Sequence, residues 1–236
     1  MSKNFKKHQV IKIVSISLVS LIAISATSFL IWTSDYYHAD EVAQDFYKKD
    51  KTIKKSGDLY FLPRENSSRG FIFYPGAKVE AIAYLPILEK IRDECNINCV
   101  LVEMPLNLAF FDQNAASVAM DEYQQITDWY IGGHSLGGAI SSQYASNHQS
   151  KVAGLILMGA YIYGNYPSKK ALTIYGSLNS DLEKNITYSD NIIKIEGGNH
   201  AQFGNYGKQK GDPDAIITSE EQQSIAVDAI DKFINS

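Results

Sequence analysis

Ser135 lies at the centre of Gly133-His134-Ser135-Leu136-Gly137, which matches the pattern G-x-S-x-G. An apolar, aromatic-rich run precedes the pattern, and a helix-compatible run follows it. A sharp turn from strand to helix holds its central serine at a strained backbone angle, and flanking glycines avoid collisions with neighbouring backbone. The hydroxyl then projects at the start of a helix, where backbone N–H groups and the helix dipole face it. Ser135 is therefore the candidate nucleophile, and the alternative is a glycine-rich turn that contains a serine by chance.

A serine hydroxyl needs a base to take its proton, and histidine is the usual base. Of the five histidines, only His200 follows a late strand-like run on a glycine-rich loop. We expect the ring of His134 to point away from the adjacent serine, while His148 lies ~18 Å along the following helix. His200 is the predicted base. A turn histidine stabilised by Asn199 is the alternative.

The third member of such a site is a carboxylate that orients the imidazole and stabilises its cation. The loop after the predicted strand 172–175 offers Asp181 first and Glu183 second. Asn179 stands where the register places the acid, but an amide stabilises an imidazolium much less well. Asp181 is the predicted acid, with a helix N-cap as its alternative role.

An oxyanion is stabilised by two backbone N–H donors aimed at the same point. Leu136 supplies one because it follows the nucleophile, and Ala77 supplies the other from the loop after the predicted strand 71–74.

The elements around these residues alternate between strand and helix patterns. Strands are predicted at 71–74, 99–102, 129–133, 152–158, 172–175 and 192–195, and helices at 79–94, 115–126, 136–147 and 219–234. Alternation of this kind predicts an α/β domain with a mostly parallel central sheet. Sites in such sheets lie at the carboxyl ends of the strands, which is where the candidate residues fall.

Residues 13–32 carry no charged side chain and follow four lysines. A helix of that length crosses a hydrocarbon core of ~30 Å. The basic flank predicts a cytoplasmic tail at 1–12, a transmembrane signal-anchor at 13–32 and an extracellular domain at 36–236, in a single-pass protein of the cell membrane. A cleaved signal peptide is the alternative.

The chain of 236 residues carries a net charge of −4, and beyond residue 34 it holds 18 basic and 26 acidic residues. An acidic body argues against nucleic acid as a partner. The two cysteines, Cys95 and Cys99, have no second pair or nearby histidine to complete a metal shell. No metal or cofactor is predicted. A disulfide between these cysteines and a pair of free buried thiols both remain open.

Four segments, 73–78, 104–111, 132–138 and 197–204, resemble the α/β-hydrolase superfamily, and more narrowly the membrane-anchored bacterial hydrolases grouped near dienelactone hydrolases. The resemblance covers about residues 36–236. It implies an α/β-hydrolase fold and a triad in the chain order serine, acid, histidine. Family members carry an aspartate three residues after the strand-end glycine, where this chain has Asn179.

The predicted function is that of an extracytoplasmic, membrane-anchored serine hydrolase, in particular a carboxylesterase. The segment between the elbow helix and the acid loop is too short for a large lid, which predicts small or exposed acyl esters as substrates. Asn179 motivates the alternative, a binding or scaffold protein on a catalytically weakened hydrolase fold.

Overall fold

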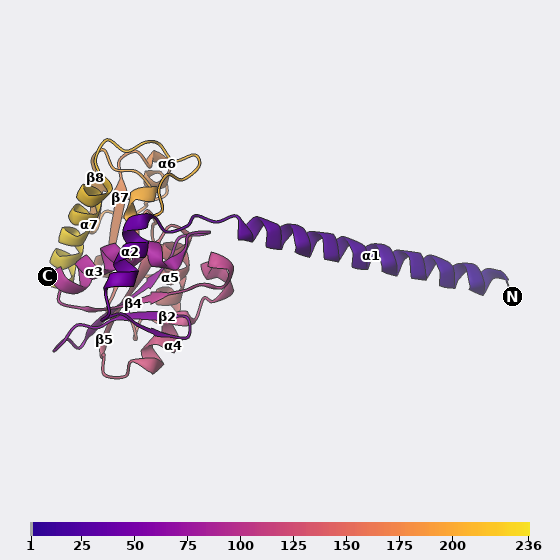
Figure 1. The fold of residues 1–236 in the computed structure, drawn as a ribbon, viewed down its shortest axis with the longest axis horizontal. Helices are drawn as coiled ribbons and strands as arrows, with labels where there is room; N and C mark the ends of the chain where they lie inside the picture. Colours follow the sequence, from indigo (N-terminus) through magenta and orange to yellow (C-terminus); the bar gives the residue numbers. More distant parts are fainter. Residues whose placement is uncertain (1) are drawn as a thin grey trace. The chain divides into compact units, whose positions relative to one another are not determined.

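The computed structural model describes residues 2–236, and the chain divides into two compact units, Met1–Tyr36 and Tyr37–Ser236. The first unit is formed by helix α1 (Ser2–Ser34), which is labelled in Figure 1. Its stretch Ile11–Ser34 has a mean hydropathy of 2.2 and is long and apolar enough to cross a membrane. Length and composition alone support that reading, and a signal sequence near an N-terminus meets the same criterion.

The second unit is built on one eight-stranded sheet in the order β1-β2-β4-β3-β5-β6-β7-β8. The strands are β1 (Lys54–Ser56), β2 (Leu59–Leu62), β3 (Arg69–Tyr74), β4 (Asn98–Val102), β5 (Asp128–His134), β6 (Gly154–Met158), β7 (Ala171–Gly176) and β8 (Ile192–Ile195). The edge strand β1 pairs antiparallel with β2, which pairs antiparallel with β4, and β3 to β8 run parallel to one another. The mostly parallel sheet predicted from the alternating pattern is confirmed.

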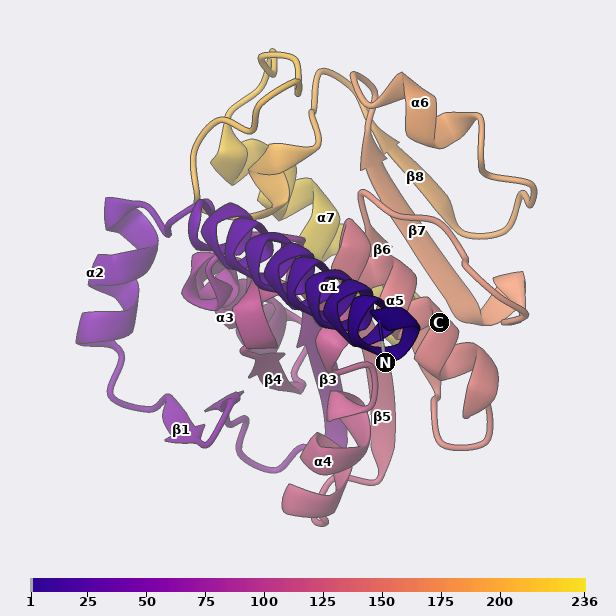
Figure 2. The same cartoon turned by 90° about the vertical axis from the view of Figure 1, so that its right-hand side faces the viewer.

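Helices cover both faces of this sheet, as Figures 1 and 2 show for the second unit. One face carries α2 (Glu41–Lys49), α3 (Leu85–Glu94) and α7 (Ser219–Ile234); the other carries α4 (Ala115–Glu122) and α5 (Leu136–Asn147). The short α6 (Ser180–Glu183) follows β7. Single 3-10 turns are formed by Ala81–Tyr84, Pro105–Asn107, Ala109–Phe111, Ser168–Lys170 and Ala201–Phe203.

The burial of β3 on both faces of the sheet explains why its residues 71–74 are apolar at every position and do not alternate with polar residues. Phe71 and Phe73 belong to the core beneath α3 and α7, whereas Ile72 and Tyr74 belong to the core beneath α4 and α5. All four side chains are fully buried. Successive side chains of a strand point to opposite faces, so a sheet with helices on both sides needs apolar residues at every position.

The structure divides one predicted helix and decides between the two possible states of the cysteines. The predicted helix 79–94 is divided into a 3-10 turn and α3, with Pro86 in the first turn of α3. Proline fits the first turn because its missing N–H has no intrahelical partner there. Cys95 and Cys99 are free thiols, both buried in the core, so the structure contains no disulfide between them.

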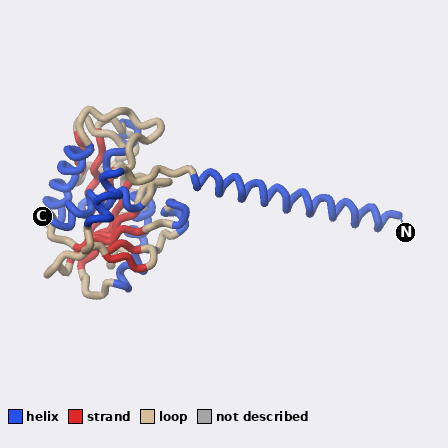
Figure 3. Tube along the Cα trace, viewed as in Figure 1, coloured by secondary structure: helices blue, strands red, loops and turns tan. Residues whose placement is uncertain are grey.

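The parallel strands bring several loops to one edge of the sheet. In Figure 3 the strands of the second unit form one block, with loops and helices around it. The loops after β3, β5, β7 and β8 carry Ala77, Ser135, Asn179 and His200, respectively. Residues more than one hundred positions apart in sequence are thereby collected at the carboxyl ends of neighbouring strands.

Candidate active site

Ser135 occupies a strained turn between β5 and α5. Its backbone angles are φ +53° and ψ −122°, in a region that costs a non-glycine residue of order 1–3 kcal/mol. The turn is tight because α5 begins directly against the end of β3. A Cβ atom on Gly137 would lie 2.1 Å from the carbonyl oxygen of Tyr74, and one on Gly133 would lie 2.3 Å from the same atom. The glycines therefore permit the close approach that exposes the serine.

Ser135 and His200 line one cavity of about 430 Å³. Its other walls are largely apolar and come from α5, from the loop after β6 and from α6; they include Leu136, Ala139, Ala160, Tyr161, Tyr163 and Leu182. A candidate nucleophile and a candidate base thus face a shared space that is large enough for a small organic group.

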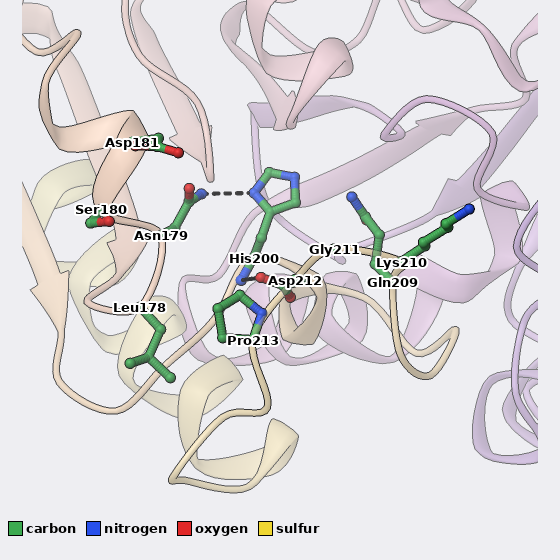
Figure 4. A pocket seen from close by; sticks show the side chains of 10 residues that line it. All are labelled: Leu178, Asn179, Ser180, Asp181, His200, Gln209, Lys210, Gly211, Asp212 and Pro213. Carbon is green, nitrogen blue, oxygen red and sulfur yellow. Dashed lines mark hydrogen bonds between the residues drawn. The ribbon is translucent and has the colours of Figure 1, made fainter.

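The loop after β7 places Asn179, and not Asp181, against the imidazole. The side-chain nitrogen of Asn179 lies 2.9 Å from Nδ1 of His200, as Figure 4 shows. The side chain of Asp181 is 90% exposed, and its Oδ1 accepts a hydrogen bond of 2.7 Å from Nζ of Lys184. Glu183 pairs with Lys194 at 3.0 Å. Asp181 lines the cavity of Ser135 and His200, but its carboxylate pairs with a lysine, as that of Glu183 does, and neither carboxylate binds the imidazole.

Asp212 is a residue of this site that the sequence analysis does not single out. Its two carboxylate oxygens accept hydrogen bonds from the backbone N–H groups of His200, at 3.1 Å, and Ala201, at 2.8 Å. The loop that carries it is tied back to the histidine loop, because Asn199 Nδ2 donates to the carbonyl oxygen of Pro213. Glycine and proline flank Asp212 and predict a turn, but no spacing rule connects it to His200.

The charge state of His200 reflects these surroundings. Burial lowers the pKa of His200 below its ordinary value of about 6.5, and the Asp212 carboxylate acts in the opposite direction. The imidazole is consequently neutral at pH 7, which is the state in which a histidine can accept a proton.

His134 lies fully buried behind the turn and joins three of the loops. Its Nε2 lies 2.9 Å from the carbonyl oxygen of His200, so Nε2 carries a proton and donates it. Burial lowers the pKa of His134 well below its ordinary value, so its Nδ1 bears no proton and accepts the hydroxyl of Tyr84 at 2.8 Å. The Tyr84 oxygen accepts the N–H of Gly76 at 3.2 Å. The expected direction of the His134 ring, away from Ser135, agrees with these partners.

The two predicted oxyanion donors are the backbone N–H groups of Leu136, at the start of α5, and Ala77, in the loop after β3. A Cβ atom on Gly137 would also lie 2.3 Å from the carbonyl oxygen of Pro75, so the start of α5 packs against the loop that carries Ala77. Within residues 2–236, no hydrogen bond occupies the backbone N–H of Ala77 or Leu136. Both N–H groups are thus available as donors. No group of three or more histidine, cysteine, aspartate or glutamate residues in the described chain is arranged to hold a metal ion.

Comparisons with known proteins agree on the fold. The model of the alpha/beta hydrolase family matches residues 70–224. Carboxyl esterase 2 from the mycorrhizal fungus Tuber melanosporum is similar with a TM-score of 0.58 and 10% identity, over 85% of this chain and 91% of that one. Alpha/beta hydrolase domain-containing protein 10 from mouse has a TM-score of 0.52 and 13% identity, over 78% and 97%.

A soluble variant of monoglyceride lipase from Saccharomyces cerevisiae has a TM-score of 0.54 and 8% identity, over 79% of this chain and 94% of that one. At such identities the likeness concerns the fold alone. No curated protein matches the sequence.

Proposed function

The chain belongs to the alpha/beta hydrolase family, and we propose that it is a serine hydrolase of the carboxylesterase type. The single observation that carries the proposal is the cavity shared by Ser135 and His200, with the serine held in a strained strand-to-helix turn. Strain of this kind persists where surrounding packing enforces it, and it is concentrated at functional sites.

In the proposed reaction, Ser135 Oγ attacks the ester carbonyl carbon while Nε2 of His200 takes the hydroxyl proton. The negative charge that develops on the carbonyl oxygen is stabilised by the N–H groups of Ala77 and Leu136. Collapse of this intermediate expels the alcohol, which receives the proton from His200, and leaves an acyl group on Ser135. Water then repeats the sequence, with His200 again as base, and releases the acid.

Asn179 takes the orienting position in this proposal, in place of Asp181. An amide offers an acceptor on one side and a donor on the other. When Oδ1 of Asn179 faces His200, the imidazole carries its proton on Nδ1, and Nε2 keeps the lone pair that the reaction requires. When Nδ2 of Asn179 faces His200, the imidazole carries its proton on Nε2 instead. The structure has Nδ2 in that place. The reaction therefore requires the amide to be turned by half a rotation, so that its oxygen accepts from Nδ1–H.

The walls of the cavity support small or exposed acyl esters as substrates. They are formed mainly by apolar atoms of Leu136, Ala139 and Leu182 and by the rings of Tyr161 and Tyr163. Residues 159–170 join β6 to β7 with a single 3-10 turn, so the loop above the nucleophile is short. A substrate with a compact acyl group matches a site of this size.

Anchoring in a membrane is part of the same proposal. The apolar stretch of α1 has the length of a membrane span, and the four lysines among residues 1–12 favour a cytoplasmic N-terminus. The hydrolase unit would then lie outside the cell, at the surface of the cell membrane.

The proposal is tested by assaying the full chain in detergent micelles on acyl esters of two to sixteen carbons. We expect hydrolysis that is fastest for short chains and is abolished by Ser135→Ala with an unchanged melting temperature. A second candidate is a binding or scaffold protein, which the neutral Asn179 favours because it supplies no charge to an imidazolium. A folded wild-type chain without hydrolysis of any ester would support that candidate instead.

A further inference from the structure

The carboxylate of a serine-hydrolase triad performs two tasks: it orients the imidazole, and it stabilises the positive charge that the imidazole acquires. Asn179 contacts Nδ1 of His200 but carries no charge, so it can perform only the first task. A site with Asn179 alone lacks a partner for the imidazolium that forms when Ser135 loses its proton.

Asp212 brings a carboxylate to the same histidine from its backbone side. Both oxygens are fixed, one on the N–H of His200 and one on the N–H of Ala201. The backbone nitrogen of His200, whose N–H donates to Asp212, is two bonds from the Cβ atom that carries the imidazole ring. Figure 4 shows the Asn179 amide at the ring of His200 and Asp212 at the backbone end of the residue.

The loop that carries Asp212 is held in place on both sides. Asp212 itself donates its N–H to the carbonyl oxygen of Gln209, and Pro213 accepts from Asn199, the neighbour of His200. Asn199 is held in turn by Gln222 of α7, whose Oε1 accepts the Asn199 N–H at 3.0 Å. The carboxylate is thus fixed relative to the histidine before any reaction begins.

We propose that the two tasks of a triad acid are divided in this protein, with Asn179 orienting the imidazole of His200 and Asp212 supplying the stabilising negative charge. The inference rests on the proposed function and deepens it. Asp212 is a positioning and electrostatic residue rather than a catalytic one, since it contacts the backbone of the base and not the reacting atoms.

Other ionisable groups around His200 do not provide this charge. Asp181 of α6 pairs with Lys184, and Lys210 lines the same cavity as Asp212 with a charge of the opposite sign. His134, which packs against the ring at 4.5 Å between centroids, is kept neutral by burial. Asp212 is also the group whose charge favours the protonated form of His200, against the effect of burial.

The test compares wild type, Asp212→Asn, Asn179→Asp and the double variant, using the full chain in detergent micelles. The pKa of His200 is measured by NMR of the imidazole C–H groups, and the acid limb of kcat/KM is measured on a short-chain ester. We expect Asp212→Asn to lower both values by ~0.5–1 pH unit, because a nearby negative charge is removed. We expect Asn179→Asp to raise kcat at least ~10-fold in the Asp212→Asn background and by a smaller factor in wild type.

Asp214→Asn is the matched control, since Asp214 lies two positions away on the same loop and pairs with Lys208 at the surface. It removes the same charge without touching the histidine loop and is expected to leave the pKa of His200 in place. Asp212→Ser is a second variant in case Asp212→Asn unfolds, because a hydroxyl still accepts from one N–H while the charge is absent.

A His200 pKa that is the same in wild type and in the folded Asp212 variants would overturn the inference, as would equal gains from Asn179→Asp in both backgrounds. The NMR measurement does not depend on turnover. If the pKa falls as expected but no ester is hydrolysed by wild type, the proposed function fails and the electrostatic coupling between Asp212 and His200 stands. If esters are hydrolysed but the pKa does not move, the division of tasks fails by itself.

Discussion

The side-chain nitrogen of Asn179 lies 2.9 Å from Nδ1 of His200, at the point of the fold where a hydrolase triad holds its acid. Asn179 follows the last residue of β7 by three positions, on the loop that faces the histidine loop. A neutral partner in this place supplies no negative charge to the imidazole.

Replacing Asn179 by aspartate should increase activity. A carboxylate in contact with Nδ1 selects the tautomer with a free Nε2 and stabilises the imidazolium, and loss of such a carboxylate elsewhere costs about 10⁴-fold. We expect Asn179→Asp to raise kcat by about 3- to 10-fold in wild type, less than in the Asp212→Asn background, and to move the acid limb of kcat/KM to higher pH. Steady-state kinetics between pH 4 and 9 measure both effects. An unchanged rate with an unchanged acid limb would show that Asn179 does not control His200.

Replacing Asp181 by asparagine should have little effect on turnover. Its carboxylate is exposed and paired with Lys184, so its removal affects a surface ion pair of small energetic value. We expect kcat/KM to change by less than about 3-fold, with Glu183→Gln as the comparison on the same loop. A loss of 100-fold or more in Asp181→Asn alone would return Asp181 to the role that the sequence predicted.

The stability of the protein should decrease in acid because His134 is buried in its neutral form. Its pKa in the folded state is lowered well below 6.5, so the unfolded chain binds a proton first as the pH falls. The contribution of the neutral His134 to the free energy of unfolding is therefore complete above pH 6.5. Below pH 6.5 it decreases by up to ~1.4 kcal/mol per pH unit. Chemical unfolding from pH 7 to 5 measures the slope. In His134→Gln, which can keep both hydrogen bonds, the slope should be smaller; an identical slope would contradict the assignment.

Removing the hydroxyl of Tyr84 should destabilise the junction between the loops. Tyr84→Phe leaves Nδ1 of His134 and the N–H of Gly76 without a partner inside the core. We expect a loss of about 2–4 kcal/mol in the free energy of unfolding. Tyr123→Phe is the control, since Tyr123 stacks on Phe61 on the opposite side of the sheet, and it should cost less than about 1 kcal/mol. Equal losses in both variants would contradict the directed chain of hydrogen bonds.

Elements with a strong local pattern were predictable from sequence. The buried strands β3 and β4 contain the apolar runs 71–74 and 99–102, and α7 begins and ends at the predicted residues 219 and 234. The strand-to-helix turn at Ser135 was predictable because glycines at 133 and 137 are required wherever the two segments approach so closely. His200 followed from topology, since it is on the loop after the last strand of the parallel sheet.

The partners of His200 were not predictable in the same way. The choice between Asn179 and Asp181 depends on where α6 begins, and a difference of two residues turns a side chain from the histidine to the solvent. Residue type favoured Asp181, whereas the backbone geometry favours Asn179. Asp212 contacts backbone N–H groups, and contacts of that kind leave no pattern in the sequence because many polar residues can accept from a backbone N–H.

Activation of the Ser135 hydroxyl by the fold is measured by covalent labelling. The full chain and Ser135→Ala would each be treated with a fluorophosphonate, which reacts with activated serines, and the modified residue would be located by mass spectrometry. We expect labelling of wild type at Ser135, slower labelling in His200→Gln and none in Ser135→Ala. Folded wild-type protein that remains unlabelled, or labelling at another residue that persists in Ser135→Ala, would contradict it.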